Sequence, residues 1–356
     1  MQLSIKHFVT IVGPMLLLVL YCEYLNYYIV LWQCQWPELG LDQEPKDKLK
    51  AIFISDPHLL GSRQGHWFDK LRREWQMHRG FVTATQIFEP EVVFFLGDLF
   101  DEGKWSSAEE FSSTVQRFHS LFPFEPKIVL VGNHDIGFHY SVTRYKRERF
   151  YSAFGMDTLG VRRFSIKNVH FILIDSLAMH GDECNFCAPA MQKVKDLSKQ
   201  LDCMKKKEFS KPILLQHFPL FRENDEDCHD DPDVLTDPEE KSKPFKPKFD
   251  CLSRNSTEHL LENIRPRLVL SGHTHHGCKI NHTLKDSEKV PEWSVASFSW
   301  RNRNNPVIIL GTFTQDEFVL NKCFLPHEST VIIIYVYGII LIAFFARQKF
   351  FGRFWL

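Results

Sequence analysis

The amino-acid sequence predicts an α/β domain between an N-terminal and a C-terminal transmembrane helix. Two observations predict it: short apolar runs alternate with amphipathic stretches through the middle of the 356 residues, and a long apolar run lies near each end. The 43 Lys and Arg residues balance 44 Asp and Glu residues, so we expect no nucleic-acid partner. A charged fraction of 24% together with 32 Phe residues excludes a disordered chain.

The first apolar run, residues 8–32, follows a short tail at 1–7. A bilayer takes roughly 17–25 residues to cross, and this run is long enough. Glu23 interrupts it, and we place this charge near the lumenal end. A cleaved signal peptide is the alternative, but no small-residue cleavage site follows Leu20, so the sequence favours a retained anchor.

The second apolar run, residues 329–346, contains no charged residue and no polar face. A buried core helix is the alternative, although its place at the end of the chain favours a membrane helix. Cationic residues flank both runs at Lys6, Arg347, Lys349 and Arg353. By the positive-inside rule, the tails 1–7 and 347–356 are cytosolic and the intervening chain is lumenal.

Glycosylation triplets and cysteines are compatible with a lumenal domain. Asn255 and Asn281 each begin an Asn-x-Thr triplet, which is an acceptor only in the secretory pathway. Nine cysteines suit an oxidising compartment, although their pairing cannot be read from spacing. Cys184 and Cys187 are spaced as a redox or metal pair, but without a second such pair a structural disulfide or plain thiols are favoured.

The lumenal chain divides into a polar linker, residues 33–49, and one domain, residues 50–325. Apolar runs predict strands at 51–54, 92–96, 127–131, 171–174, 213–215, 268–270, 307–310 and 317–323. Amphipathic runs predict helices at 70–88 and 107–121. Within residues 222–250, an acidic run precedes a basic run; we interpret this as a solvated surface insertion, with a docking surface as the alternative.

Polar residues follow five of the predicted strands at the point where each strand ends. These blocks are Asp56-Pro-His58, Gly97-Asp98-Leu-Phe-Asp101, Gly132-Asn133-His134-Asp135, Gln216-His217 and Gly272-His273-Thr-His275. One Asp or His at a strand end is usually a turn residue, but five such blocks should converge, because open α/β sheets bind ligands at the carboxyl ends of their strands. Oxygen and imidazole ligands without thiolate suit manganese, iron or zinc. Seven candidate ligands are more than one ion needs and suit two ions.

The order of these blocks resembles the calcineurin-like metallophosphoesterase superfamily, with its D-x-H, G-D-x-x-D, G-N-H-[DE], isolated H and G-H-x-H motifs. The resemblance implies a metal-dependent phosphoesterase built as a two-sheet sandwich flanked by helices (α/β/β/α). It also implies two metal sites that share Asp98. The ligands of one metal would be Asp56, His58, Asp98 and His275, and those of the other Asp98, Asn133, His217 and His273.

The expected reaction is attack by a metal-generated hydroxide on a phosphorus atom. The leaving alkoxide needs a proton, and His134 is the candidate acid. Asp101 would orient His134, as the matching residue does in the superfamily, and Asp135 is the alternative. Arg301 and Arg303 could hold the substrate phosphate or a glycan; an exposed polar loop is the alternative.

The residue after Asp101 bears on the substrate. Protein serine/threonine phosphatases have Arg in this place, whereas this chain has Glu102. A carboxylate there would repel the dianion of a phosphomonoester, which favours a phosphodiester with one charge less.

Residues 54–59, 97–103 and 297–306, with the two flanking apolar runs, further resemble superfamily members that remodel glycosylphosphatidylinositol (GPI) anchors. This resemblance implies removal of the ethanolamine-phosphate branch from the second mannose of GPI, with Mn²⁺ as the metal. It also implies residence at endoplasmic reticulum (ER) exit sites, the ER-Golgi intermediate compartment and the cis-Golgi. There the enzyme would promote export of GPI-anchored proteins, with a cargo receptor or trafficking machinery as further partners.

Two other functions fit the same motifs. One is a lumenal phosphatase or pyrophosphatase that acts on another phospholipid or a nucleotide. The other is a scaffold without catalysis, which is disfavoured because every expected ligand and His134 are present. The chain ends in Gly-Arg-Phe-Trp-Leu, which is no Lys-based retrieval signal.

Overall fold

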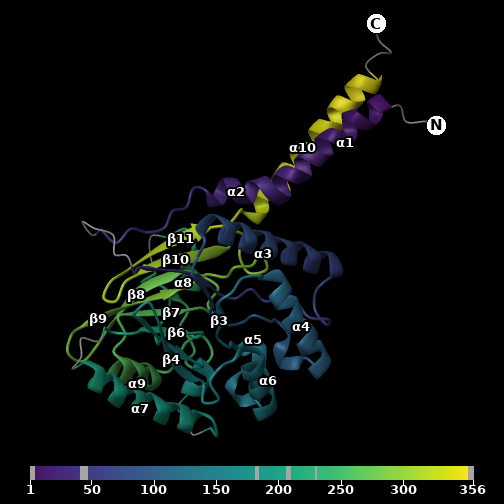
Figure 1. Ribbon diagram of the computed structural model, residues 1–356. Helices are drawn as coiled ribbons and strands as arrows, with labels where there is room; N and C mark the ends of the chain where they lie inside the picture. The colour runs from purple at the N-terminus through teal and green to yellow at the C-terminus, as the bar shows by residue number, and fades with distance from the viewer. Residues whose placement is uncertain (1–4, 41–46, 181–183, 206–209, 229–230, 352–356) are drawn as a thin grey trace.

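Two mixed β-sheets pack face to face, with helices over both outer faces (Figure 1). The computed structural model describes residues 5–40, 47–180, 184–205, 210–228 and 231–351. The first sheet has the strand order β11 (Phe318–Phe324), β10 (Val307–Phe313), β1 (Leu49–Ile54), β2 (Val92–Phe95) and β3 (Lys127–Val129). The second has the order β4 (Val161–Ile166), β5 (Val169–Ile174), β6 (Ile213–Gln216), β7 (Leu268–Ser271), β9 (Lys289–Ser294) and β8 (Cys278–Thr283). This confirms the two-sheet sandwich that the resemblance implies.

Both faces of the central strands are apolar because each face meets a different layer. In β1, Phe53 packs between the sheets, whereas Ile52 and Ile54 pack under the helices. The ring centroid of Phe94 lies 4.9 Å from that of Phe53 on the neighbouring strand and, across the sandwich, 5.0 Å from that of Phe171. The alternation of strand side chains thus builds two apolar layers from one continuous apolar run.

Helices α3 (Trp67–Phe88) and α4 (Ala108–Leu121) lie over the first sheet, and α7 (Cys187–Lys205) and α9 (Arg254–Ile264) over the second (Figure 1). The sequence signal for α4 is a capping box. The Ser107 hydroxyl accepts the N–H of Glu110, and the Glu110 carboxylate accepts the N–H of Ser107. Shorter helices are α5 (Asn133–Ile136), α6 (Arg144–Phe154) and α8 (Pro238–Ser242).

The eight predicted strands and two predicted helices are all present, with shifts of a few residues at their ends. The prediction missed β4, β8 and β9. The missed strand β8 alternates between buried and exposed residues and carries Lys279, Asn281 and His282, so it has no apolar run. Both β4 and β8 lie at the edges of their sheet, where polar strands are tolerated.

The two terminal helices leave the domain together and lie side by side (Figure 1). They are α1 (Ile5–Leu20), which continues into a π-helical turn at Tyr21–Leu25, and α10 (Glu328–Phe351). By length and composition, the stretches Val9–Leu31 and Glu328–Lys349 could each cross a membrane. The charge within the first stretch has a partner, because the Tyr335 hydroxyl donates to Glu23 at 2.6 Å.

After the π-helical turn, α2 (Asn26–Leu31) bends onto the domain (Figure 1). Tyr27 and Leu31 are fully buried against the core under α3, so this part of the predicted anchor also packs on the domain. A disulfide between Cys34 and Cys323 then ties the following segment to β11.

Two further disulfides are present in the described part of the chain. Cys184 and Cys187 are bonded to each other, so this pair forms a disulfide and not two plain thiols. Cys228 and Cys278 connect the charged segment 222–250 to β8. Among the described cysteines, Cys22 and Cys251 are free and buried.

The charged segment 222–250 is packed on the domain rather than solvated throughout, so that interpretation was wrong in part. Asp233 is fully buried, and its carboxylate lies 2.6 Å from Nζ of Lys322 on β11. Asp231 lies 3.0 Å from the same ammonium group. Opposite charges between the segment and the sheet therefore hold the segment in place.

Candidate metal centre

The backbone at the strand ends adopts a conformation that apolar periodicity does not predict. Five of the seven candidate ligands have φ in the left-handed region, at 53° for Asp56, 48° for His58, 50° for Asp98, 72° for His273 and 61° for His275. Residues other than Gly rarely adopt this backbone conformation, which costs about 1–3 kcal/mol per residue. Such strain typically gathers at functional sites, and here it turns the side chains toward one point.

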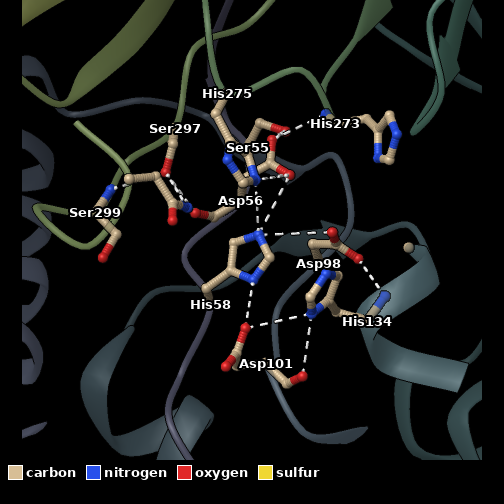
Figure 2. Close-up of polar contacts among 12 residues, drawn as sticks. Ser55, Asp56, His58, Asp98, Asp101, His134, His273, His275, Ser297 and Ser299 are labelled. Carbon is tan, nitrogen blue, oxygen red and sulfur yellow. Dashed lines mark hydrogen bonds and ion pairs between the residues drawn. The ribbon is translucent and has the colours of Figure 1, made fainter. Parts of the chain in front are cut away.

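The first group of ligands converges on Nε2 of His58 (Figure 2). This nitrogen lies 3.7 Å from Oδ1 of Asp56, 3.5 Å from Oδ2 of Asp98 and 3.0 Å from Nε2 of His275. Nε2 of His275 is also 3.7 Å from Oδ1 of Asp56. The four side chains can therefore offer one atom each to a single cation.

The second group converges on the other side of Asp98. Nε2 of His217 lies 3.4 Å from Oδ2 of Asp98 and 3.2 Å from Oδ1 of Asn133. Asp98, His217 and His273 offer ligand atoms within 4.8 Å of one another. The structure thus brings all seven predicted ligands together, and Asp98 belongs to both groups.

Hydrogen bonds from the surrounding chain decide which nitrogen of each imidazole faces the centre. Nδ1 of His217 lies 2.8 Å from the carbonyl oxygen of Leu96, so Nε2 is left for a metal. Nε2 of His273 lies 2.6 Å from the carbonyl oxygen of Phe249, so Nδ1 is left instead. Metal-binding histidines are usually oriented in this way by a carbonyl or carboxylate.

Two buried ligand atoms lack a hydrogen-bond partner among the described residues: Oδ1 of Asp56 and Nδ1 of His273. Leaving a buried polar atom unpaired costs about 1–3 kcal/mol, so such atoms are rare without a reason. Both atoms point into the groups described above, and a bound cation satisfies them. The residues present therefore fit two divalent cations.

The protonation of three ligands, His273, His275 and Asp98, suits cations. Burial lowers the pKa of His273 to about 3 and that of His275 to about 4, so both imidazoles are neutral at neutral pH. Burial acts in the opposite direction on Asp98, but the neighbouring histidines, His217 above all, hold its pKa well below the usual range. Neutral imidazoles and an ionised carboxylate are the forms that bind metal. For His58 and His217, burial lowers the pKa, but the surrounding carboxylates outweigh it and raise the pKa to about 10 and about 9, so a cation would displace a proton from each.

His134 lies at the rim of the centre, and its ring faces Asp101 (Figure 2). Nδ1 of His134 is 3.2 Å from Oδ1 of Asp101 and 3.1 Å from the Asp101 carbonyl oxygen. The alternative partner, Asp135, accepts the N–H of Phe100 at 2.9 Å and of Gly132 at 2.8 Å. Asp135 therefore holds the turn, whereas Asp101 is positioned to orient His134.

Glu102 does not face the metal centre, so the charge argument drawn from it was wrong. Its side chain is buried and accepts the N–H of Arg63 at 3.0 Å and that of Gln64 at 2.6 Å. A charged group that does approach is Lys104, whose Nζ lies 3.3 Å from Nδ1 of His134. No sequence motif marks Lys104, so its position beside His134 could not be predicted.

Arg301 and Arg303 both reach residues of the centre rather than open space. Nη2 of Arg301 lies 2.8 Å from Oδ2 of Asp101. Nη1 of Arg303 lies 3.3 Å from the carbonyl oxygen of His275 and 2.6 Å from Nδ1 of His276. The loop that carries them thus supports Asp101 and the His275 backbone.

A cavity of about 460 Å³ opens over the centre. Its wall includes three residues of the charged segment 222–250, and no sequence motif connects these residues with the site. The lining residues are Asp98, Asn133, His134, Phe138, Lys246, Phe249, Asp250, His273 and His275. The charged segment therefore forms one side of the space available to a substrate.

Residues 49–277, which contain all seven candidate ligands, match the calcineurin-like phosphoesterase family. The chain belongs to this family. Together with the convergent group Asp56, His58, Asp98 and His275, membership identifies a metal-dependent phosphoesterase.

Within this family, the chain is similar to proteins named metallophosphoesterase 1. It is 46% identical to that of Rattus norvegicus over 337 residues, which cover 89% of this chain and 82% of the relative. The protein of Danio rerio is 45% identical over 353 residues, covering 94% and 90%. A solved structure described as "GAP50 the anchor in the inner membrane complex of Plasmodium" is 10% identical, with a TM-score of 0.43 over 81% of this chain and 94% of that one.

Proposed function

We propose that this chain is a phosphodiesterase that removes the ethanolamine-phosphate branch from the second mannose of GPI anchors. One observation carries the proposal: a complete two-metal ligand set with His134 at its rim, in a chain similar over 89% of its length to metallophosphoesterase 1. The GPI substrate itself rests on the resemblance of residues 54–59, 97–103 and 297–306.

Each group of ligands would hold one divalent cation, and we propose Mn²⁺, for which oxygen and imidazole ligands are suitable. The bound cations would supply a hydroxide near neutral pH and offset phosphate charge. Asp98 would help to hold both ions, since its Oδ2 lies within 3.5 Å of Nε2 of both His58 and His217. Its other oxygen, Oδ1, accepts the N–H of His134 at 2.7 Å and is thereby fixed.

His134 would donate a proton to the leaving alkoxide oxygen through Nε2. Its Nδ1 faces Asp101, which keeps that nitrogen protonated and leaves Nε2 directed away. The ring is partly exposed at the cavity, so a substrate oxygen can reach it. This acid matters most when the leaving group is a sugar alkoxide, which departs poorly without a proton.

One observation favours the alternative of a metallophosphatase or pyrophosphatase acting on another phospholipid or on a nucleotide. With Glu102 turned away, the Lys104 ammonium group is the nearby charge, and it would favour a more highly charged phosphate. The assignment of a diester therefore depends on the family resemblance and not on electrostatics.

We further propose that α1 and α10 anchor the enzyme in membranes of ER exit sites, the ER-Golgi intermediate compartment and the cis-Golgi, with both termini cytosolic. Three disulfides favour an oxidising lumen for the domain. Asn255 and Asn281 are exposed, as glycosylation requires. GPI-anchored proteins would be the substrates, and a cargo receptor or trafficking machinery would be further partners.

The decisive experiment is removal of the gene followed by mass spectrometry of cell-surface GPI glycans. Cells without the protein should retain ethanolamine phosphate on the second mannose and export GPI-anchored proteins slowly. Wild-type protein should reverse both effects, and the His134→Ala variant should not. Unchanged ethanolamine-phosphate content with normal export would overturn the proposal.

A further inference from the structure

We propose that Phe138, Tyr140 and Phe249 form an aromatic platform that binds the sugar ring of the substrate beside the metal centre. This inference rests on the proposed function and adds to it the surface that would recognise the glycan. The platform combines a loop that follows α5 with the charged segment 222–250, which are distant in sequence.

The three rings lie against one another, and two of them, Phe138 and Phe249, line the cavity. The ring centroid of Phe249 is 5.5 Å from that of Phe138 and 6.4 Å from that of Tyr140. Phe138 and Tyr140 are nearly parallel, with an interplanar angle of 4°. Tyr140 is 75% exposed and Phe249 is 45% exposed. Exposing clustered aromatic surface costs about 25 cal/mol per Å², and such surfaces usually bind something.

The platform is fixed relative to the metal ligands by backbone contacts. The carbonyl oxygen of Phe249 is the group that orients His273. The turn that carries Phe249 is closed by its own N–H and that of Asp250, which donate to the carbonyl of Lys246 at 3.1 and 2.9 Å. A phosphate held at the metals would therefore lie at a constant position relative to the Phe249 ring.

Phe138 connects the other half of the platform to the centre. It follows α5, which contains Asn133 and His134. Its ring centroid lies 6.4 Å from that of Phe218, the neighbour of His217 in sequence. One side of the platform thus lies on a segment that supplies the candidate ligand Asn133, and the other side contacts the candidate ligand His273 through the Phe249 carbonyl.

The chemistry of this surface matches a hexose. Aromatic faces carry partial negative charge and attract the C–H groups on one face of a sugar ring. Lys246 and Asp250 line the same cavity and can bond to ring hydroxyls, as the few polar groups of a ligand site commonly do. A phosphodiester on a mannose places its phosphate and its ring next to each other, as the metals and the platform are.

Binding to the full-length, metal-loaded protein tests the platform without requiring turnover. The probes are mannose 6-phosphate and glycerol 3-phosphate, which share the phosphate but differ in the ring. Phe249→Ala removes the ring and keeps the carbonyl that orients His273. We expect about tenfold weaker binding of mannose 6-phosphate, unchanged binding of glycerol 3-phosphate, and recovery in Phe249→Tyr.

Two further variants separate recognition from folding. Tyr140→Ala should weaken the binding of mannose 6-phosphate but not that of glycerol 3-phosphate. Among the described contacts, Tyr140 touches no candidate metal ligand. Tyr145→Ala removes a similarly exposed ring on α6 that does not line the cavity and should change nothing. Equal weakening of both probes in Phe249→Ala, or no weakening in Tyr140→Ala, would overturn the platform.

The failure of this inference can be told apart from the failure of the proposed function. If the enzyme leaves GPI glycans uncleaved but the binding of mannose 6-phosphate still depends on Phe249, the proposed function is wrong and the sugar platform stands. If GPI is cleaved but both platform variants bind normally, the platform falls alone. If the platform variants weaken the binding of adenosine 5′-monophosphate but not that of mannose 6-phosphate, the rings bind a nucleobase and the inference is wrong.

Discussion

Arg301 and Asp101 form an ion pair at the edge of the metal centre, with 2.8 Å between Nη2 and Oδ2. The other carboxylate oxygen of Asp101 lies 3.2 Å from Nδ1 of both His58 and His134. Arg301 therefore holds the residue that orients one candidate ligand and the candidate acid. From the sequence alone, Arg301 is instead expected to hold the substrate phosphate or a glycan.

Replacing Arg301 with Gln should lower kcat about 10–100-fold, because Asp101 loses the partner that fixes it. KM should change little if the guanidinium acts through Asp101 and not on the substrate. Steady-state kinetics on a soluble phosphodiester would measure both values. A large rise in KM with normal kcat would instead restore the substrate-binding role.

The His134→Ala variant should keep its metal but lose about 10²–10⁴-fold in kcat on diesters with alkyl leaving groups. A nitrophenyl diester should be affected much less, since its leaving group departs without a proton. Metal content by plasma mass spectrometry provides the control. Normal turnover of the alkyl diester would reject His134 as the acid.

Asp98→Asn should impair both cation sites together, because Oδ2 of Asp98 lies between Nε2 of His58 and Nε2 of His217. Loss of the shared negative charge weakens a ligand of each group, because a neutral amide oxygen binds a cation less strongly than a carboxylate. Metal titration by calorimetry should show two weakened sites. Asp250→Asn, which changes a carboxylate on the cavity wall, should retain both; selective loss of one ion in Asp98→Asn would contradict the bridge.

Glu102→Ala should destabilise the fold by about 1–3 kcal/mol, because it removes the acceptor for two backbone N–H groups. The free energy of unfolding from urea titration measures this loss. The preference between phosphomonoesters and phosphodiesters should not change, since the carboxylate faces away from the centre. A shift in that preference would show that Glu102 does act on the substrate.

Glu292 should make stability depend on pH. Burial raises its pKa, but the hydrogen bond from His282 at 2.7 Å and the other groups around the carboxylate leave the pKa below its ordinary value. The stabilisation is therefore present above the unfolded pKa of about 4.3 and is lost as pH falls below it. Urea midpoints of wild type and Glu292→Gln should differ near pH 7 and approach each other only below about pH 4, as the pH falls through the lowered pKa of folded Glu292.

The candidate ligands could be predicted because each depends on a local pattern. Asp56, Asp98 and Asn133 come within four residues of the ends of β1, β2 and β3, and the parallel pairing of these strands brings their carboxyl ends to one edge of a sheet. The same reasoning found the eight apolar strands. It missed β8 and β9, because their alternating polar residues resemble a loop when only apolar runs are counted.

The sequence by itself determined the seven candidate ligands, the family and the positions of the core strands, because all three depend on short segments whose chemistry is local. Only the tertiary structure decided where Glu102 points, which residue Arg301 holds, and that Phe249 lies over the metal cavity. Each of these depends on a partner distant in sequence. Such pairings arise when whole elements pack, and no spacing within a single segment specifies them.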